Sequence, residues 1–96
     1  MNTTAKIPDE PKDLVRFSCE APGAKTVYLI GDFNAWNHTS DPMKRQADGS
    51  WVRQVPLSCG RHYYKFLVDG KPVLDPHAMY YTLGAGQEFV SFIALG

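Results

Sequence analysis

Short runs of alternating apolar and polar residues recur along the chain, and residues that favour turns bound each run. Residues 14–21 place Val15, Phe17 and Cys19 on one face, with polar side chains between them. Residues 26–31 form a second run, which is rich in β-branched and aromatic side chains. Alternation with a period of two is typical of strands that bury one face. These two runs predict the first two strands.

Two Asp-Gly pairs predict tight turns in the second half of the chain. The pair at 48–49 directly precedes an alternating run over 51–57, and the pair at 69–70 lies inside the stretch RHYYKFLVDGKPVL, where it joins a run over 61–68 to a short strand over 71–74. Asp-Gly beside alternating runs is typical of a β-hairpin. A final apolar run over 88–95 predicts the last strand.

No stretch keeps a helical period over ten residues. Short strands, separated by turns at intervals of about 8–12 residues, favour an all-β, immunoglobulin-like sandwich of about seven strands. A β-barrel is the alternative. Because Pro8 and Pro11 interrupt the N-terminus, we expect residues 1–12 to be a flexible lead-in and residues 13–96 to form one domain.

The composition narrows the functions that such a domain can have. The chain has 96 residues, 44% of them hydrophobic, which suffices for one small core. Lys+Arg and Asp+Glu both number 10, without a basic cluster, which argues against nucleic acid or acidic lipid as a partner. No apolar run resembles a signal peptide or spans a membrane, so we expect a cytoplasmic protein. Cys19 and Cys59 are far apart and are expected to be buried or half-buried free thiols.

The residues that usually carry catalysis are poorly placed for it. Asp48 and Asp69 precede glycine, and Asp41 and Asp75 precede proline. In such turns a short carboxylate bonds local backbone amides. The three histidines are widely separated, and no nucleophile motif or phosphate-binding glycine loop is present. The sequence therefore predicts no enzyme active site, no metal and no cofactor.

The stretch YLIGDFNAWN ends a predicted strand at Gly31 and then places Trp36 among loop-forming residues. The C–H face of a sugar ring stacks on an indole, while its hydroxyls need polar partners at the edge of that ring. Asn34 lies near Trp36 in the loop, and Lys65 is on the outward face of its strand. Trp36 therefore either stacks on a sugar or packs over one end of the sandwich, with Phe33 as the expected anchor of the loop.

The remaining aromatic residues divide between core and surface. Trp51 is in phase with Val55 and Leu57, which predicts that its indole lies in the core. Tyr80 and Tyr81 lie outside the predicted strands. Together with Trp36, Trp51 and Tyr63, they raise the aromatic content beyond what so small a core must hide.

The stretch VYLIGDFNAWN, followed after an Asp-Gly turn by WVRQVPLSCGRHYYKFLVDGKPVLDP, resembles the glycogen-binding, early-set carbohydrate-binding modules of family forty-eight. Such modules occur in the beta subunit of AMP-activated protein kinase and at the N-termini of isoamylases and glycogen branching enzymes. The resemblance runs from about Asp13 to the C-terminus. It implies an immunoglobulin-like sandwich that binds α-glucan without catalysis.

The resemblance also implies a set of sugar-binding residues. The tryptophan that stacks on glucose corresponds to Trp36, and the lysine that bonds sugar hydroxyls corresponds to Lys65. A leucine that packs into the oligosaccharide matches Leu83, and a polar residue that bonds a hydroxyl matches Gln87. Pro72 stands where kinase-subunit members have a second tryptophan, and it offers a flat apolar surface instead.

Three functions fit this resemblance. The first is a glucan-binding module that brings a partner enzyme to glycogen or a starch-like glucan. The second is a protein-interaction module that has lost sugar binding at Pro72, unless Tyr80 or Tyr81 replaces the missing ring. The third is the N-terminal accessory domain of an α-glucan-processing glycoside hydrolase. The initial Met and the polar lead-in favour a stand-alone product over a piece of a larger enzyme.

Overall fold

The computed structural model describes residues 12–96, which form eight β-strands and two short 3₁₀ turns. The strands are β1 (Asp13–Glu20), β2 (Val27–Gly31), β3 (Lys44–Arg45), β4 (Ser50–Leu57), β5 (Gly60–Val68), β6 (Lys71–Val73), β7 (Tyr80–Leu83) and β8 (Phe89–Leu95). The 3₁₀ turns are η1 (Asp32–Asn34) and η2 (Ala85–Gln87). The prediction of an all-β domain is confirmed. The predicted lead-in lies outside the described residues, except for residue 12.

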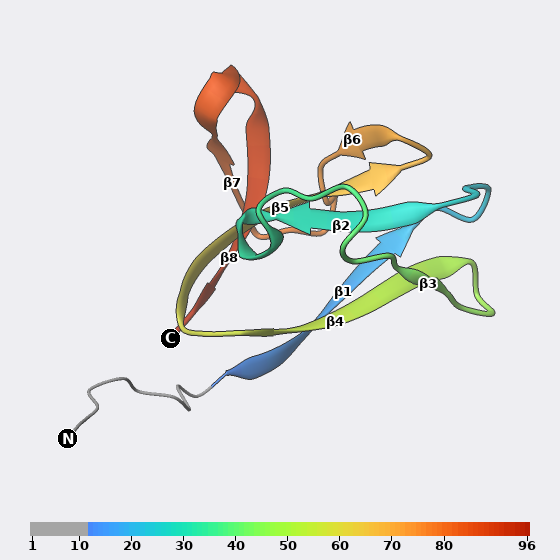
Figure 1. Cartoon of the computed structure of the whole chain (residues 1–96), viewed down its shortest axis with the longest axis horizontal. Coiled ribbons are helices and arrows are strands. Elements are labelled where there is room, and N and C mark those ends of the chain that lie inside the picture. Colours follow the sequence, from blue (N-terminus) through green and yellow to red (C-terminus); the bar gives the residue numbers. More distant parts are fainter. Residues whose placement is uncertain (1–11) are drawn as a thin grey trace.

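The strands form two antiparallel sheets that pack as a sandwich (Figure 1). In the three-stranded sheet, β4 lies between β1 and β3. The five-stranded sheet has the order β2-β5-β8-β7, with β6 also paired to β5. Strand β5 is central because it pairs with β2, with β8 over residues 60–64 and with β6 over residues 66–68.

Both Asp-Gly pairs form the turns that the sequence predicts. Asp69 and Gly70 have φ angles of +48° and +83° and connect β5 to β6. Gly49 has a φ of +88° in the turn that connects β3 to β4. Glycine adopts positive φ freely and aspartate tolerates it, so these residue types allow the chain to reverse within a few residues.

Two strands lie outside the runs that the sequence predicted. Strand β3 has only two residues and pairs with β4. Strand β7 pairs with β8 over Tyr80–Leu83. Three of its four residues are exposed, so burial imposes no alternation that the sequence would show. β7 matters for function because it widens the five-stranded sheet by one strand.

The core lies between the two sheets. Tyr64 and Phe66 of β5, Leu29 of β2 and Phe17 of β1 are each at most 4% exposed. The rings of Phe17 and Tyr64 meet edge to face, with centroids 4.8 Å apart. Trp51 is 7% exposed, and its indole Nε1 donates a hydrogen bond of 2.9 Å to a backbone carbonyl after β1. The prediction that Trp51 belongs to the core is therefore confirmed.

The two cysteines have different environments. Cys19 is buried, and burial raises the pKa of its thiol to about 11, with the carboxylates of Asp75 and Glu20 adding to the rise. Cys59 is exposed, so the prediction of a buried or half-buried thiol is wrong there, because this residue lies in the turn between β4 and β5. Within residues 12–96, no helix is long and apolar enough to cross a membrane.

Candidate functional site

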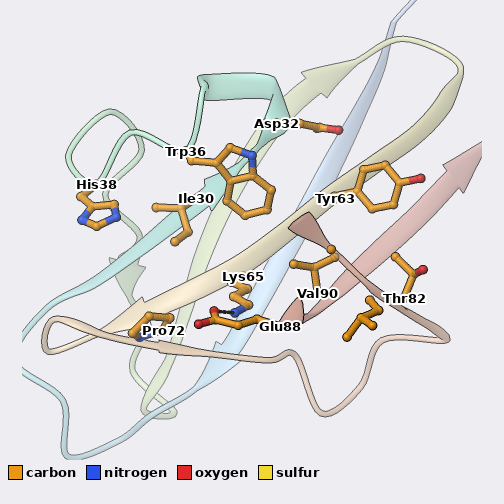
Figure 2. Close-up of a pocket in the computed structure, with 12 residues that line it drawn as sticks. Ile30, Asp32, Trp36, His38, Tyr63, Lys65, Pro72, Thr82, Glu88 and Val90 are labelled. Atoms are coloured by element: carbon orange, nitrogen blue, oxygen red, sulfur yellow. Dashed lines mark hydrogen bonds and ion pairs between the residues drawn. The ribbon is translucent and has the colours of Figure 1, made fainter. Parts of the chain in front are cut away.

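A groove of about 620 Å³ lies on the face of the five-stranded sheet that points away from the core (Figure 2). Strands β2, β5 and β6, the loop after β2 and the β7–β8 hairpin all contribute to it. Its lining residues are Ile30, Asp32, Trp36, His38, Tyr63, Lys65, Pro72, Thr82, Leu83, Gly84, Glu88 and Val90. An apolar lining with a few charged groups is typical of small-molecule sites.

Strand alternation directs Lys65 into this groove. Tyr64 and Phe66 on either side of it point into the core, so Lys65 points to the opposite face. Its cross-strand partner Ile30 lies beside it on that face. The prediction that Lys65 faces outward is confirmed, although its side chain is only 13% exposed.

The loop after β2 carries Trp36 to the edge of the groove. The chain leaves β2 through η1, and the N–H of Trp36 donates a hydrogen bond of 2.8 Å to the carbonyl of Gly31. Ala35 and Trp36 both have a φ of +57°, a left-handed conformation that residues other than glycine rarely adopt. The indole is 36% exposed and lines the groove. Surrounding contacts must therefore hold this loop in its shape.

Asn34 supplies three of those contacts and does not line the groove. Its Oδ1 accepts a hydrogen bond of 3.1 Å from the N–H of Gly31. Its Nδ2 donates to the carbonyl of Leu29 at 3.0 Å and to Oδ2 of Asp41 at 2.7 Å. The sequence predicted Asn34 as a sugar contact, but the structure engages its amide within the loop. We therefore leave Asn34 out of the proposed binding residues.

Asp41 fastens the far end of the same loop. Its Oδ1 accepts hydrogen bonds from Nε and Nη2 of Arg53 in β4, at 3.0 and 2.8 Å. Its backbone carbonyl accepts a hydrogen bond of 2.9 Å from the N–H of Leu29. The loop is thus bonded to both sheets, and the backbone that carries Trp36 is held without any ligand.

Phe33 anchors the loop from the core side, as the sequence predicted. Its ring packs against the core and stacks on Phe17, with centroids 5.9 Å apart. A Cβ atom on Gly31 would lie 2.5 Å from the Phe33 ring and 2.6 Å from the carbonyl oxygen of Tyr63. Glycine is required at position 31 because the neighbouring atoms leave no room for a side chain.

Lys65 and Glu88 form an ion pair in the groove (Figure 2). The lysine Nζ donates to Oε1 of Glu88 at 3.1 Å. Gln87, which the sequence predicted as a sugar contact, is exposed and is not a lining residue. The polar side chain that reaches the groove from this turn is therefore one position further along the chain than predicted.

Leu83 and Pro72 complete the apolar edge of the groove. Leu83 lies in β7 and is 55% exposed, whereas Pro72 lies in β6, opposite Leu67 of β5. The structure thus brings four of the six predicted residues to one groove: Trp36, Lys65, Pro72 and Leu83.

A second aromatic ring does line the groove, but neither Tyr80 nor Tyr81 supplies it. Tyr80 stacks on Phe92 with centroids 5.1 Å apart, and the hydroxyl of Tyr81 donates to a backbone carbonyl at 2.9 Å. The expectation that one of them replaces the missing ring is not met. The ring that lines the groove is that of Tyr63, two residues before Lys65 on the same face of β5, and it packs against Phe92 with centroids 5.5 Å apart. The period-two alternation of this strand in the sequence already places Tyr63 and Lys65 on the same face.

Asp75 is a structural residue rather than a catalytic one. It is 8% exposed, and its carboxylate accepts hydrogen bonds from the hydroxyl of Tyr64 at 2.7 Å and from the N–H of His77 at 2.9 Å. Burial first, and the bond to Asp75 second, raise the pKa of Tyr64. Among residues 12–96, no cluster of three or more His, Cys, Asp or Glu side chains is arranged to hold a metal ion.

The chain is similar to known proteins over most of its length. A family model described as the glycogen recognition site of AMP-activated protein kinase matches residues 15–93. The chain is 40% identical over 74 residues to the 1,4-α-glucan branching enzyme GlgB of Bacillus caldolyticus, covering 71% of this chain and 11% of that enzyme. It is 43% identical over 56 residues to the corresponding enzyme of Deinococcus radiodurans, covering 58% of this chain and 8% of that enzyme. The chain therefore spans about a tenth of the length of these relatives.

The sandwich and the groove on its sheet define a small β-domain of the carbohydrate-binding type. The chain belongs to the glycogen recognition family of carbohydrate-binding modules, since the family model covers most of its length. Modules of this family are non-catalytic accessory domains.

Proposed function

We propose that this chain binds α-glucans, such as glycogen, starch or maltooligosaccharides, along the groove of its five-stranded sheet. The observation that carries the proposal is that Trp36, Lys65 and Leu83 come from three separate segments and line one groove. Family membership supports the same ligand class, because the family is described as a glycogen recognition site.

Each lining residue has a chemical role in this proposal. The indole of Trp36 and the ring of Tyr63 offer flat surfaces to the C–H faces of glucose. Lys65 lies between these two rings and Pro72 (Figure 2). The ammonium group of Lys65 donates hydrogen bonds to sugar hydroxyls. Pro72 and Leu83 pack against the outer side of the glucan chain. Because an open groove buries little surface, we expect a dissociation constant of about 1 μM to 1 mM.

We further propose that the module holds a catalytic partner near its glucan. The relatives described above are branching enzymes, and this chain spans about a tenth of their length. An accessory position beside a catalytic domain, in the same chain or in a partner subunit, accounts for that similarity. A protein-interaction module without sugar binding is the competing function.

Calorimetric titration with maltoheptaose and β-cyclodextrin tests the binding proposal. Trp36→Ala removes the exposed indole. We expect this change to weaken binding at least about tenfold, which corresponds to a loss of about 1.4 kcal/mol in binding free energy. The intrinsic fluorescence of the wild-type protein should also shift on binding, since Trp36 lies at the groove while Trp51 is buried.

Met79→Ala is the matched control, because Met79 is 85% exposed and is not a lining residue of the groove. It should bind maltoheptaose as the wild type does. A wild-type protein that gives no heat at millimolar sugar would overturn the glucan proposal and favour the interaction module. Unchanged binding by Trp36→Ala would retain the function but contradict the site.

A further inference from the structure

Lys65 and Glu88 form an ion pair inside the groove, in which Nζ of the lysine lies 3.1 Å from Oε1 of the glutamate. The two side chains differ greatly in exposure, because that of Lys65 is 13% exposed and that of Glu88 is 73% exposed. Lys65 projects from the middle of β5, whereas Glu88 follows η2 in the β7–β8 hairpin. Figure 2 shows the glutamate reaching to the lysine across the groove. The Lys65 ammonium is therefore mostly shielded from solvent, while the Glu88 side chain that bonds it is mostly exposed.

The other carboxylate of the groove does not share this role. Asp32 also lines the groove, but its Oδ1 lies 4.0 Å from Nδ1 of His62. The Nε2 of His62 lies 2.8 Å from the carbonyl oxygen of Ser58. Glu88 is therefore the carboxylate that holds the Lys65 ammonium.

We propose that Glu88 competes with glucan for Lys65 and thereby lowers the affinity of the groove. This inference rests on the proposed glucan-binding function. A sugar hydroxyl that takes the N–H now bonded to Glu88 displaces the carboxylate, which can move because most of its surface already faces solvent. Binding then exchanges a hydrogen bond between two opposite charges for one between the ammonium and a neutral hydroxyl, which is the weaker partner. Glu88 thus sets how tightly the module holds its ligand.

The proposal predicts an unusual dependence on salt. The ligand is neutral, so an ordinary glucan site would respond little to ionic strength. Here salt screens the Lys65–Glu88 attraction, and the Debye length falls from about 10 Å at 0.1 M to about 3 Å at 1 M. The affinity of the wild-type protein for maltoheptaose should therefore rise between low and high NaCl concentrations.

Calorimetric titration of Glu88→Gln with maltoheptaose tests the inference directly. Gln keeps the size of the side chain but removes the charge that holds Lys65. Partly exposed ion pairs contribute little, so we expect the affinity to increase about 1.5-fold to 5-fold. The salt dependence should disappear in this variant. In a Lys65→Met background, Glu88→Gln should leave the affinity unchanged, because the effect acts through the lysine.

Glu20→Gln is the matched control. Glu20 is also an exposed glutamate, and its Oε1 pairs with His77 at 3.6 Å rather than with a lining residue of the groove. Glu20→Gln removes the same charge as Glu88→Gln. It should keep both the affinity and the salt dependence of the wild type.

Equal or weaker binding by Glu88→Gln than by the wild type would overturn the inference, since Glu88 would then be neutral or helpful. In that case wild-type binding would still stand, and the proposed function with it. If neither the wild type nor Glu88→Gln responds to millimolar glucan, the proposed function fails and this inference fails with it.

Discussion

Asp69 illustrates how a single carboxylate determines a turn. Its Oδ1 accepts hydrogen bonds from the N–H groups of Lys25 and Thr26, at 2.8 and 2.9 Å, and its own N–H donates to the carbonyl of Thr26 at 2.9 Å. The β5–β6 turn is thereby joined to the start of β2. The backbone bonds from Thr26 and Lys25 are the main reason that the pKa of Asp69 lies below its ordinary value of 3.8.

This lowered pKa predicts a pH dependence of stability. A carboxyl group with a lower pKa in the folded state stabilises the fold above its unfolded pKa and loses this contribution as the pH falls through its folded value. Asp69→Asn keeps the side-chain shape and an acceptor oxygen but removes the titration. We expect a lower urea midpoint for the variant at pH 7, and a difference from wild type that narrows as the pH falls below 3.8.

Asp13→Asn provides the control for this measurement. Asp13 is exposed at the start of β1, and within residues 12–96 its carboxylate receives no backbone hydrogen bond. This variant should keep the wild-type urea midpoint at pH 7, because it loses no bond of the kind that Asp69 makes. A difference for Asp69→Asn that widens as the pH falls would contradict the role given to this carboxylate.

At the scale of elements, the loop between β2 and β3 is the feature that makes the sheet a site. The sequence predicted where it begins and that Phe33 anchors it. Its rigidity comes from contacts between distant residues, such as the bonds from Arg53 of β4 to Asp41. Three hydrogen bonds of the Asn34 side-chain amide join residues within this loop to one another and to the end of β2. Trp36 is thus exposed because these hydrogen bonds fix the shape of the loop that carries it.

Gly31→Ala tests this dependence. The added Cβ would press on the Phe33 ring and on the backbone carbonyl of Tyr63, so the surrounding structure must shift to relieve both contacts. Overpacking of this kind costs about 1–3 kcal/mol, and we expect a loss of that size in the free energy of unfolding by urea. Because the displaced ring lies beneath the Trp36 loop, the affinity for maltoheptaose should fall as well.

Gly23→Ala is the control for Gly31→Ala, since a Cβ at position 23 would meet no atom within 4 Å. It should change neither the stability nor the affinity by a measurable amount. Wild-type stability in Gly31→Ala would show that the loop adapts to the extra methyl group and that the close packing is not required.

At the scale of the whole molecule, Asp75 connects elements that are far apart in the sequence. Its carboxylate accepts from the Tyr64 hydroxyl of β5, its N–H donates to Oγ of Ser91 in β8 at 3.2 Å, and its carbonyl accepts from Tyr81 of β7. Tyr64 and Ser91 are each at most 2% exposed. Buried polar groups of this kind stabilise a fold only while all of them keep their partners.

Tyr64→Phe removes one partner and leaves the ring in the core. The buried Asp75 carboxylate then lacks a donor, which costs about 1–3 kcal/mol. We expect the free energy of unfolding, measured with urea at pH 7, to fall by that amount. Tyr80→Phe removes a hydroxyl from a ring that is 47% exposed and should have no such effect. Equal stability of both variants would show that the Asp75 network contributes nothing.

Much of the site was predictable from local patterns. Period-two alternation places Lys65 on the outer face, and the same rule places Tyr63 beside it. Glu88 was not predictable, because η2 contains a glycine with a φ of +81° that alters the direction of the chain just before it. The prediction for Asn34 was wrong for a similar reason. Its position near Trp36 in the sequence does not reveal which groups its side-chain amide bonds in the folded loop.

The sequence by itself determined most of the strands, the two Asp-Gly turns, the buried Trp51 and the family, because each depends on residues close together in the chain or on a motif read in order. Only the tertiary structure decided which side chains share the groove, that Asn34 belongs to the loop, and that Glu88 covers Lys65. Those outcomes depend on distances between residues far apart in the chain, such as the 3.1 Å between Nζ of Lys65 and Oε1 of Glu88. Local patterns set the direction of a side chain, whereas packing of the sheets sets what it meets.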